Sequence, residues 1–135
     1  MPPRIESQED LRRYLEFFNN RRYAEQIAYY APDVIYKVGS LTLASPEAIA
    51  EFYADFHTYV KERVALVEFA RNGDTVAVAL DSHFEAFRDY EKHGLSFKVG
   101  SPVHILSLVF YKLREGRIHR IRMGRYVGKP EDFIA

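Results

Sequence analysis

The stretch Val103–Leu113 reads V-H-I-L-S-L-V-F-Y-K-L, and the rest of the chain is best understood around it. Side chains alternate between the two faces of a β-strand, so a strand with one face in solvent shows one apolar row. Here both rows are apolar, and the even row contains Leu106, Leu108 and Phe110. The pattern predicts a strand covered on one face by the chain's own helices and on the other by a second subunit.

The composition is that of one globular domain spanning residues 1–135. Hydrophobic residues make up 47% and charged residues 28%, and 19 basic residues balance 19 acidic ones. A nucleic-acid or anionic-membrane partner would need a basic surplus, so we expect neither. The absence of cysteine removes disulfides and thiolate metal sites. Because Met1–Arg4 lacks the apolar segment of a signal peptide and no apolar run is long enough to span a bilayer, we expect a cytoplasmic protein.

Three helices are predicted in the N-terminal half. Ser7 is placed to cap a helix that runs to about Asn19, with acidic residues in its first turn. A second helix is predicted over residues 22–30, closed by Pro32, because the residue before a proline avoids the helical region. The sequence Ser45–Glu47 has the Ser-Pro-Glu order that is typical of a helix start, and it predicts the third helix.

Strands with turn residues between them make up most of the remaining chain. Asn72-Gly73 and Glu115-Gly116 are placed to close hairpins between the long strands. The predicted strands cover residues 33–38, 41–43, 62–71, 74–88, 95–113 and 117–127. This order predicts an α+β fold, with three N-terminal helices packed on a strongly curved, mostly antiparallel sheet around a conical pocket.

Several short pieces of the sequence match a known family pattern in their order and spacing. They are R-Y-L-x-x-x-N at Arg13–Asn19, Y-Y-A-P-D at Tyr29–Asp33, V-G-S at Val38–Ser40, A-I-A-E-F-Y at Ala48–Tyr53 and the closing strand Ile118–Gly128. In these pieces the chain resembles the NTF2-like (SnoaL-like) superfamily, and within it the ketosteroid isomerase scaffold. The resemblance implies an NTF2-like cone that admits small apolar molecules, commonly as a homodimer packed through the outer sheet faces.

The resemblance also implies which side chains face the cavity and which face a partner. Leu106, Leu108 and Phe110 are expected to face outward, into a homodimer interface, in agreement with the two apolar rows of Val103–Leu113. The inner face is expected to bind a small, mostly apolar ligand. The implied ligand-binding residues are Tyr30, Tyr53, Val78, Leu80, Ser82, Phe84, Ser107, Val109, Tyr111, Met123 and Arg125.

The isomerases hold a hydrogen-bonded tyrosine group that presents one phenol to the substrate oxygen, and by similarity these positions fall on Tyr14, Tyr30 and Tyr53. A buried phenol supported by other hydroxyls stabilises a developing oxyanion. The family's catalytic carboxylate, however, aligns near Tyr36–Val38, where the chain has none, and its second oxyanion donor aligns with Val109. Steroid isomerisation is therefore not expected.

Tyr36 and His57 are the other catalytic candidates. Tyr36 is expected at the pocket floor, as in the similar scytalone dehydratase-type enzymes, which activate a water through tyrosines and also need an inward histidine. His57 follows Tyr53 at helical spacing and is expected at the pocket edge. Histidine is the natural general base at neutral pH, but in the sequence no histidine has an obvious orienting carboxylate.

His83 and His104 are expected on the outer face of the sheet, unless a β-bulge near Ser82 turns His83 inward. Since the chain has no H-x-H or H-E-x-x-H pattern, neither a metal site nor a cofactor is expected.

Arg125 aligns with a cavity-facing position on the last strand. It is either an anchor for a carboxylate or phosphate on a ligand, or a residue that extends into solvent at the mouth of the cone or pairs with Asp33 or Glu131.

Three functions remain open from the sequence. The first is ligand binding with lyase, isomerase or cyclase chemistry on a carbonyl or hydroxylated substrate polarised by Tyr14. The second is ligand binding without chemistry, which the missing carboxylates at residues 36–38 and 109 favour. The third is a dimeric interaction module that acts through its outer sheet face.

Overall fold

The computed structural model describes residues 2–135 and contains a six-stranded sheet in the order β2-β1-β8-β7-β4-β3, with a separate β5-β6 hairpin. The helices are α1 (Gln8–Asn19), α2 (Tyr23–Ile27), α3 (Pro46–Phe56) and α4 (Pro130–Ile134). The strands are β1 (Tyr30–Val38), β2 (Leu41–Leu43), β3 (Val60–Asn72), β4 (Thr75–Ala86), β5 (Tyr90–Lys92), β6 (Leu95–Phe97), β7 (Val103–Arg114) and β8 (Arg117–Arg125).

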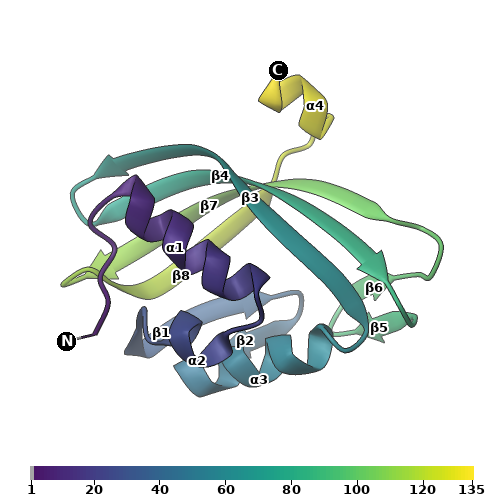
Figure 1. Cartoon of the computed structure of the whole chain (residues 1–135), viewed down its shortest axis with the longest axis horizontal. Coiled ribbons are helices and arrows are strands. Elements are labelled where there is room, and N and C mark those ends of the chain that lie inside the picture. The colour runs from purple at the N-terminus through teal and green to yellow at the C-terminus, as the bar shows by residue number, and fades with distance from the viewer. Residues whose placement is uncertain (1) are drawn as a thin grey trace.

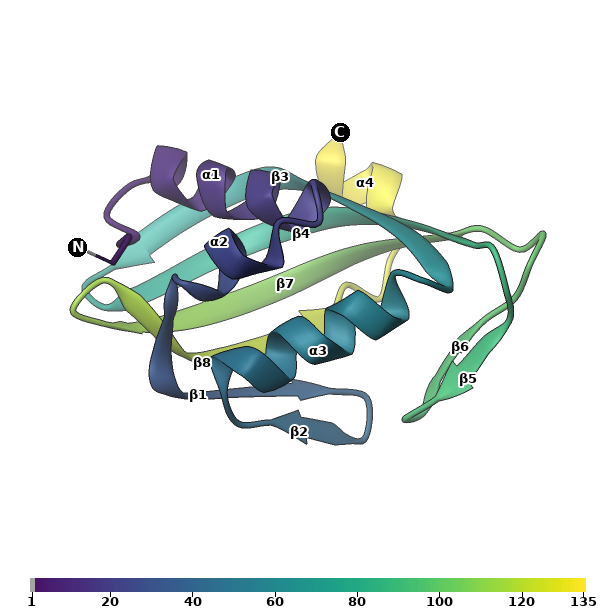
Figure 2. The same ribbon diagram turned by 60° about the horizontal axis from the view of Figure 1, so that its bottom comes forward.

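The predicted α+β architecture is confirmed. Within the main sheet β1 pairs with β8 in parallel and the other neighbours pair antiparallel. The curved sheet wraps around α1, α2 and α3, which cover its inner face, whereas α4 lies on the far side of the sheet from α3 (Figures 1 and 2). The helices and the inner face enclose the core, which is rich in tyrosine and phenylalanine.

The caps of the two long helices form as the sequence predicts. The Asp10 backbone N–H donates to Ser7 Oγ at 3.2 Å, and the Ala48 N–H donates to Ser45 Oγ at 3.1 Å. Each bond satisfies one of the N–H groups that the first helical turn leaves without a partner. The buried face of α1 is the predicted one, consisting of Leu11, Tyr14, Leu15 and Phe18.

Two predicted boundaries are wrong. The second helix ends at Ile27 rather than near residue 30, and Pro32 lies inside β1. The β1–β8 register shifts between Tyr30 and Ile35, and a proline is tolerated at such an irregularity because no ladder donor is lost there.

The predicted strand over residues 95–113 is also two strands. They are separated by residues 98–102, where Gly100 has a φ of +82°. A glycine adopts this left-handed conformation without steric cost, and it breaks the strand.

Strand β7 has the predicted two-sided character, with one difference. Leu108 and Phe110 are exposed on the outer face, by 41% and 53%. Leu106, on the same row, is only 1% exposed within the single chain, and here the C-terminal segment packs on β7, with the Tyr126 N–H donating to the Leu106 carbonyl. The homodimer interface therefore remains a prediction that rests on Leu108 and Phe110. No helix within residues 2–135 is long and apolar enough to cross a membrane.

Candidate functional site

A cavity of about 480 Å³ lies between the helices and the inner face of the sheet. Most of the side chains expected to line it do so, and among these Met123 and Arg125 are exposed, which places them at the mouth. The predicted residues on its wall are Tyr14, Tyr30, Tyr36, Tyr53, Leu80, Ser82, Phe84, Ser107, Val109, Tyr111, Met123 and Arg125. Two predicted residues are not among those on the wall: Val78 is buried in the core, and His57 contacts the wall residue Glu62.

Four phenols of the wall form two hydrogen-bonded pairs. Tyr14 on α1 and Tyr30 on β1 place their hydroxyl oxygens 2.6 Å apart, and Gln26 Nε2 donates to the Tyr30 oxygen at 2.9 Å. Tyr36 on β1 and Tyr53 on α3 place theirs 2.8 Å apart. Within a pair one hydroxyl donates to the other, so one hydroxyl hydrogen of each pair is left over. Each pair can therefore offer one donor to a ligand oxygen in the cavity.

These phenols are neutral at physiological pH, and burial makes them still harder to ionise. Desolvation raises the pKa of Tyr14 and of Tyr53 well above that of a free phenol, and it raises the pKa of Tyr30 to about 12. The pKa values of Tyr36 and Tyr111 are raised for the same reason. The cavity thus contains a set of neutral hydroxyl donors in apolar surroundings, where a hydrogen bond to a developing negative charge is strong.

The structure adds a carboxylate that the sequence analysis missed. Glu62, near the start of β3, lines the cavity and is only 8% exposed. It stands in the inward row of the strand, between the buried Val60 and Val64. The sequence does contain a signal for this residue, because a glutamate in an otherwise apolar row is expected to be buried, and a buried carboxylate is rare without a partner.

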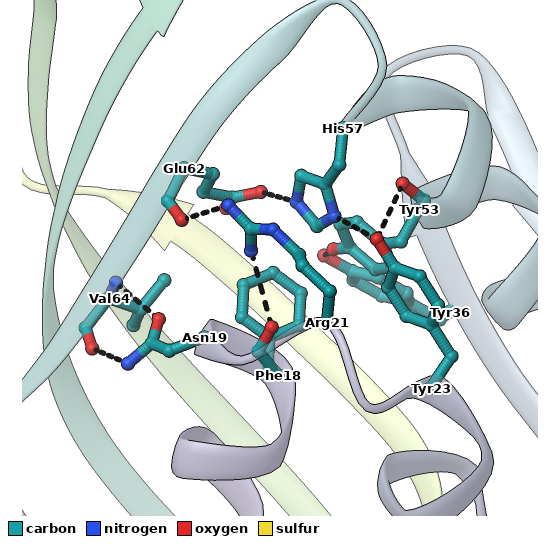
Figure 3. A network of polar contacts seen from close by, with 9 residues as sticks. All are labelled: Phe18, Asn19, Arg21, Tyr23, Tyr36, Tyr53, His57, Glu62 and Val64. Atoms are coloured by element: carbon teal, nitrogen blue, oxygen red, sulfur yellow. Dashed lines mark hydrogen bonds and ion pairs between the residues drawn. The ribbon is translucent and has the colours of Figure 1, made fainter.

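The partner of Glu62 is His57, the residue that caps the C-terminus of α3. His57 Nε2 lies 2.9 Å from Glu62 Oε1, and His57 Nδ1 lies 2.7 Å from the Tyr23 hydroxyl (Figure 3). Desolvation by burial lowers the pKa of His57 below its usual 6.5, against the pull of Glu62. A neutral ring then accepts from Tyr23 at Nδ1 and donates Nε2–H to Glu62. His57 therefore orients the carboxylate, and Tyr23 fixes the tautomer of His57.

Side chains from the end of α1 hold this part of β3 in place. The Asn19 amide donates to the Val64 carbonyl at 2.8 Å and accepts from the Val64 N–H at 2.9 Å, as a neighbouring strand would (Figure 3). Arg21 Nη2 donates to the Glu62 carbonyl at 2.6 Å, and its Nη1 donates to the Phe18 carbonyl at 3.2 Å. These contacts fix the backbone on which Glu62 stands.

The remaining candidates lie where the sequence predicts or near it. His83 and His104 are on the outer face, because β4 has no bulge at Ser82 and its ladder with β7 is regular there. The two carboxylates considered as partners of Arg125 contact other groups, Asp33 pairing with Arg114 and Glu131 with His104.

A family model described as a SnoaL-like domain matches residues 11–121. No curated protein matches the chain. An LEH-like epoxide hydrolase from Mycobacterium tuberculosis is similar in structure, with a TM-score of 0.68, 15% identity, and coverage of 87% of this chain and 80% of that one. A candidate polyketide cyclase from Pseudomonas putida gives a TM-score of 0.73 at 20% identity, with 92% of each chain covered.

A protein with a ketosteroid isomerase-like fold from Catenulispora acidiphila, solved with trimethylamine, also gives a TM-score of 0.73. It is 13% identical, and the match covers 90% of this chain and 88% of that one. At these identities the likeness concerns the fold alone. The family model covers most of the chain, and the cone of helices on a curved sheet agrees with it. The chain belongs to the SnoaL-like family, within the NTF2-like superfamily.

Proposed function

We propose that the cavity is an active site for proton transfer on a small, mostly apolar carbonyl compound, with Glu62 as the general base. One observation carries this proposal: a buried carboxylate, held by a histidine, lines the same cavity as two pairs of neutral phenols. A base and an oxyanion donor on one small cavity are the two parts that proton abstraction next to a carbonyl requires.

The reaction begins when the carbon next to the substrate carbonyl loses a proton to the Glu62 carboxylate. The electron pair of the broken C–H bond forms a carbon–carbon double bond, and the carbonyl oxygen becomes an enolate oxygen. The spare hydroxyl hydrogen of Tyr14–Tyr30 or of Tyr36–Tyr53 donates to that oxygen. In a β,γ-unsaturated substrate the protonated Glu62 then gives its proton to the γ-carbon, the carbonyl re-forms, and the carbon–carbon double bond moves next to it, which isomerises the substrate. In a dicarbonyl substrate the enolate carbon instead attacks the second carbonyl and closes a ring, and the protonated Glu62 gives its proton to the alkoxide that forms.

The surroundings of Glu62 suit a base. Glu62 and the Tyr36–Tyr53 pair line the same cavity, so one substrate can reach both. His57 uses its Nε2–H on Oε1 of the carboxylate, which holds the carboxylate in one orientation. His57 is a positioning residue in this reading.

The walls indicate the class of substrate. The cavity is mostly apolar and of a size that suits a compact organic molecule. Arg125 and Lys37, two exposed residues of its wall, stand where an acidic group on the substrate can reach them. The likeness in fold to a candidate polyketide cyclase and to a ketosteroid isomerase-like protein supports carbonyl chemistry, although the residues of the cavity carry the proposal.

Deuterium exchange tests the proposal without knowledge of the natural substrate. A panel of small cyclic ketones, enones and 1,3-diketones is incubated with the protein in D₂O, and loss of the α-proton signal is followed by NMR. We expect exchange above the buffer rate with wild-type protein and exchange at the buffer rate with Glu62→Gln.

The same panel separates catalysis from simple binding. Ligands that bind the cavity, seen as chemical-shift changes of protein resonances, but show no exchange above background would indicate a binding module without chemistry. Exchange that persists unchanged in Glu62→Gln would assign the base to another group.

A further inference from the structure

A second cluster of polar side chains lies on the outer face of the sheet, away from the cavity. It consists of Asp81 and His83 on β4 and His104 on β7. His83 and His104 are directly paired across the two strands, and Asp81 precedes His83 by two residues on the same face. One donor atom from each of the three residues lies within 4.8 Å of the others.

Both imidazoles turn the same nitrogen toward the carboxylate. His83 Nε2 lies 3.3 Å from Asp81 Oδ2, and His104 Nε2 contacts Asp81 Oδ1. The rings are stacked, with centroids 4.1 Å apart and an angle of 15° between the planes. Two imidazole nitrogens therefore face the two oxygens of one carboxylate, from strands that are paired in a regular ladder.

The other nitrogen of His104 also has a partner. His104 Nδ1 lies 3.4 Å from Glu131 Oε1 on α4. A metal-bound histidine commonly donates its second N–H to a carboxylate, which fixes the ring and raises its basicity. Glu131 stands in the place that this arrangement requires, and it comes from a different element than Asp81, His83 and His104.

We propose that Asp81, His83 and His104 form a binding site for a divalent transition-metal ion of the zinc type. His83 Nε2, His104 Nε2 and a carboxylate oxygen of Asp81 are the ligands, and Glu131 orients His104. Two imidazoles and one carboxylate suit Zn²⁺ and its neighbours rather than Mg²⁺ or Ca²⁺, which prefer oxygen ligands alone. The site is independent of the proposed catalytic chemistry.

The surroundings of the cluster set the expected character of the site. The side chain of His83 is 60% exposed, so the position left by the three protein ligands is open to a water. Arg63, paired with His83 across β3 and β4, adds a positive charge that partly offsets the negative charges of Asp81 and Glu131. A bound ion would join β4 to β7 and, through Glu131, to α4. The two histidines are far apart in sequence, which is why no metal motif was visible there.

Calorimetric titration of chelator-treated full-length protein with ZnCl₂ tests the site. We expect one Zn²⁺ per chain, and at least a tenfold loss of affinity in His83→Ala and in His104→Ala. Glu131→Gln, which leaves the ligands in place, should weaken binding by about 10- to 100-fold. His119→Ala, a histidine outside the cluster, is the matched control and should bind as wild type does.

Absorption of bound Co²⁺ in the visible range provides a second measurement, since it reports imidazole coordination directly. Circular dichroism of each variant shows that the fold is retained. Absence of zinc binding by the wild type would overturn the proposal. So would binding that survives both His83→Ala and His104→Ala, because the ion would then be held elsewhere, for example by His57 and Glu62 at the cavity.

Discussion

His57 Nε2 lies 2.9 Å from Glu62 Oε1, and this contact joins the C-cap residue of α3 to a carboxylate on the cavity wall. Tyr23 holds the other side of the ring at 2.7 Å. Two hydrogen bonds thus connect the partly buried Tyr23 through His57 to the buried Glu62. This arrangement places a buried carboxylate on the wall of a cavity that is lined mainly by apolar side chains and neutral phenols.

Glu62→Gln should abolish proton transfer while leaving the fold intact. Glutamine retains an oxygen that accepts the His57 Nε2–H, so the change removes the base and little else. We expect kcat on any substrate found to fall by about 10²- to 10⁴-fold, with ligand affinity within a few-fold of wild type. Steady-state kinetics and a binding titration measure the two effects separately.

Glu68→Gln is the matched control, because Glu68 is an exposed residue of the same strand. It should leave both quantities unchanged. A loss of affinity in Glu62→Gln as large as the loss of rate would mean that the carboxylate binds the substrate rather than deprotonating it.

Tyr14→Phe tests the oxyanion donor. It removes the hydroxyl that lies 2.6 Å from that of Tyr30 and leaves the ring in place. If this pair holds the enolate, kcat should fall by about 10²- to 10³-fold. Tyr29→Phe is the control, since the Tyr29 ring packs edge-on against Tyr14 but is not part of the cavity wall. Full activity in Tyr14→Phe would mean that the pair Tyr36–Tyr53, rather than Tyr14–Tyr30, donates to the enolate oxygen.

The lowered pKa of His57 makes the stability of the protein depend on pH. Below about pH 6.5 the unfolded chain protonates this histidine while the folded chain resists it. The stability that neutral His57 contributes is therefore present above pH 6.5 and is lost as the pH falls through the folded pKa. The free energy of unfolding should decline by up to about 1.4 kcal/mol per pH unit there.

Urea denaturation between pH 7.5 and 5 measures this slope, and it should be flatter in His57→Gln. Side-chain NMR of the wild type should show His57 titrating below its usual range, with Nε2 carrying the proton at neutral pH. An equal slope in the variant, or a His57 pKa above 6.5, would contradict the neutral tautomer on which the arrangement depends.

Asn19→Ala should loosen the strand that carries Glu62. Asn19 replaces a neighbouring strand by making two hydrogen bonds to the backbone of Val64, and loss of both should cost about 1 to 3 kcal/mol of stability. Because Glu62 stands two residues away, kcat should fall as well. Asn20→Ala changes the exposed neighbour and should alter neither. Chemical denaturation and steady-state kinetics of the two variants measure these effects. An unchanged kcat in Asn19→Ala would mean that the contact between Asn19 and Val64 does not position Glu62.

Much of the fold could be predicted because its signals are local. The capping residues Ser7 and Ser45 and the alternation in Val103–Leu113 act between near neighbours in sequence, and each appears in the structure as expected. The pairing of His57 with Glu62 was missed because a chain reversal separates them. His57 ends a helix and Glu62 belongs to the next strand, so neither the helical nor the strand period relates the two residues.

Contacts made through the sheet were harder to predict than the elements themselves. The cluster of Asp81, His83 and His104 depends on the register of β4 with β7, which alternation alone does not give. The burial of Leu106 accompanies the packing of the C-terminal segment on β7, and α4 was not among the predicted helices. In both cases long-range packing, rather than propensity, decides the environment of the residue.

Leu108→Asp tests the predicted homodimer. Leu108 and Phe110 are exposed side by side in the outward row of β7, and large apolar side chains exposed together on a sheet face commonly mark a contact surface. If two chains pack through this face, the wild type should elute as a dimer in size-exclusion chromatography with light scattering. Leu108→Asp should then be monomeric, because an unpaired charge would be buried in the interface.

Lys112→Asp, farther along the same row, should have a smaller effect, since Lys112 is only partly buried and already polar. A monomeric wild type, or a Leu108→Asp variant that stays dimeric, would show that this face is not the interface.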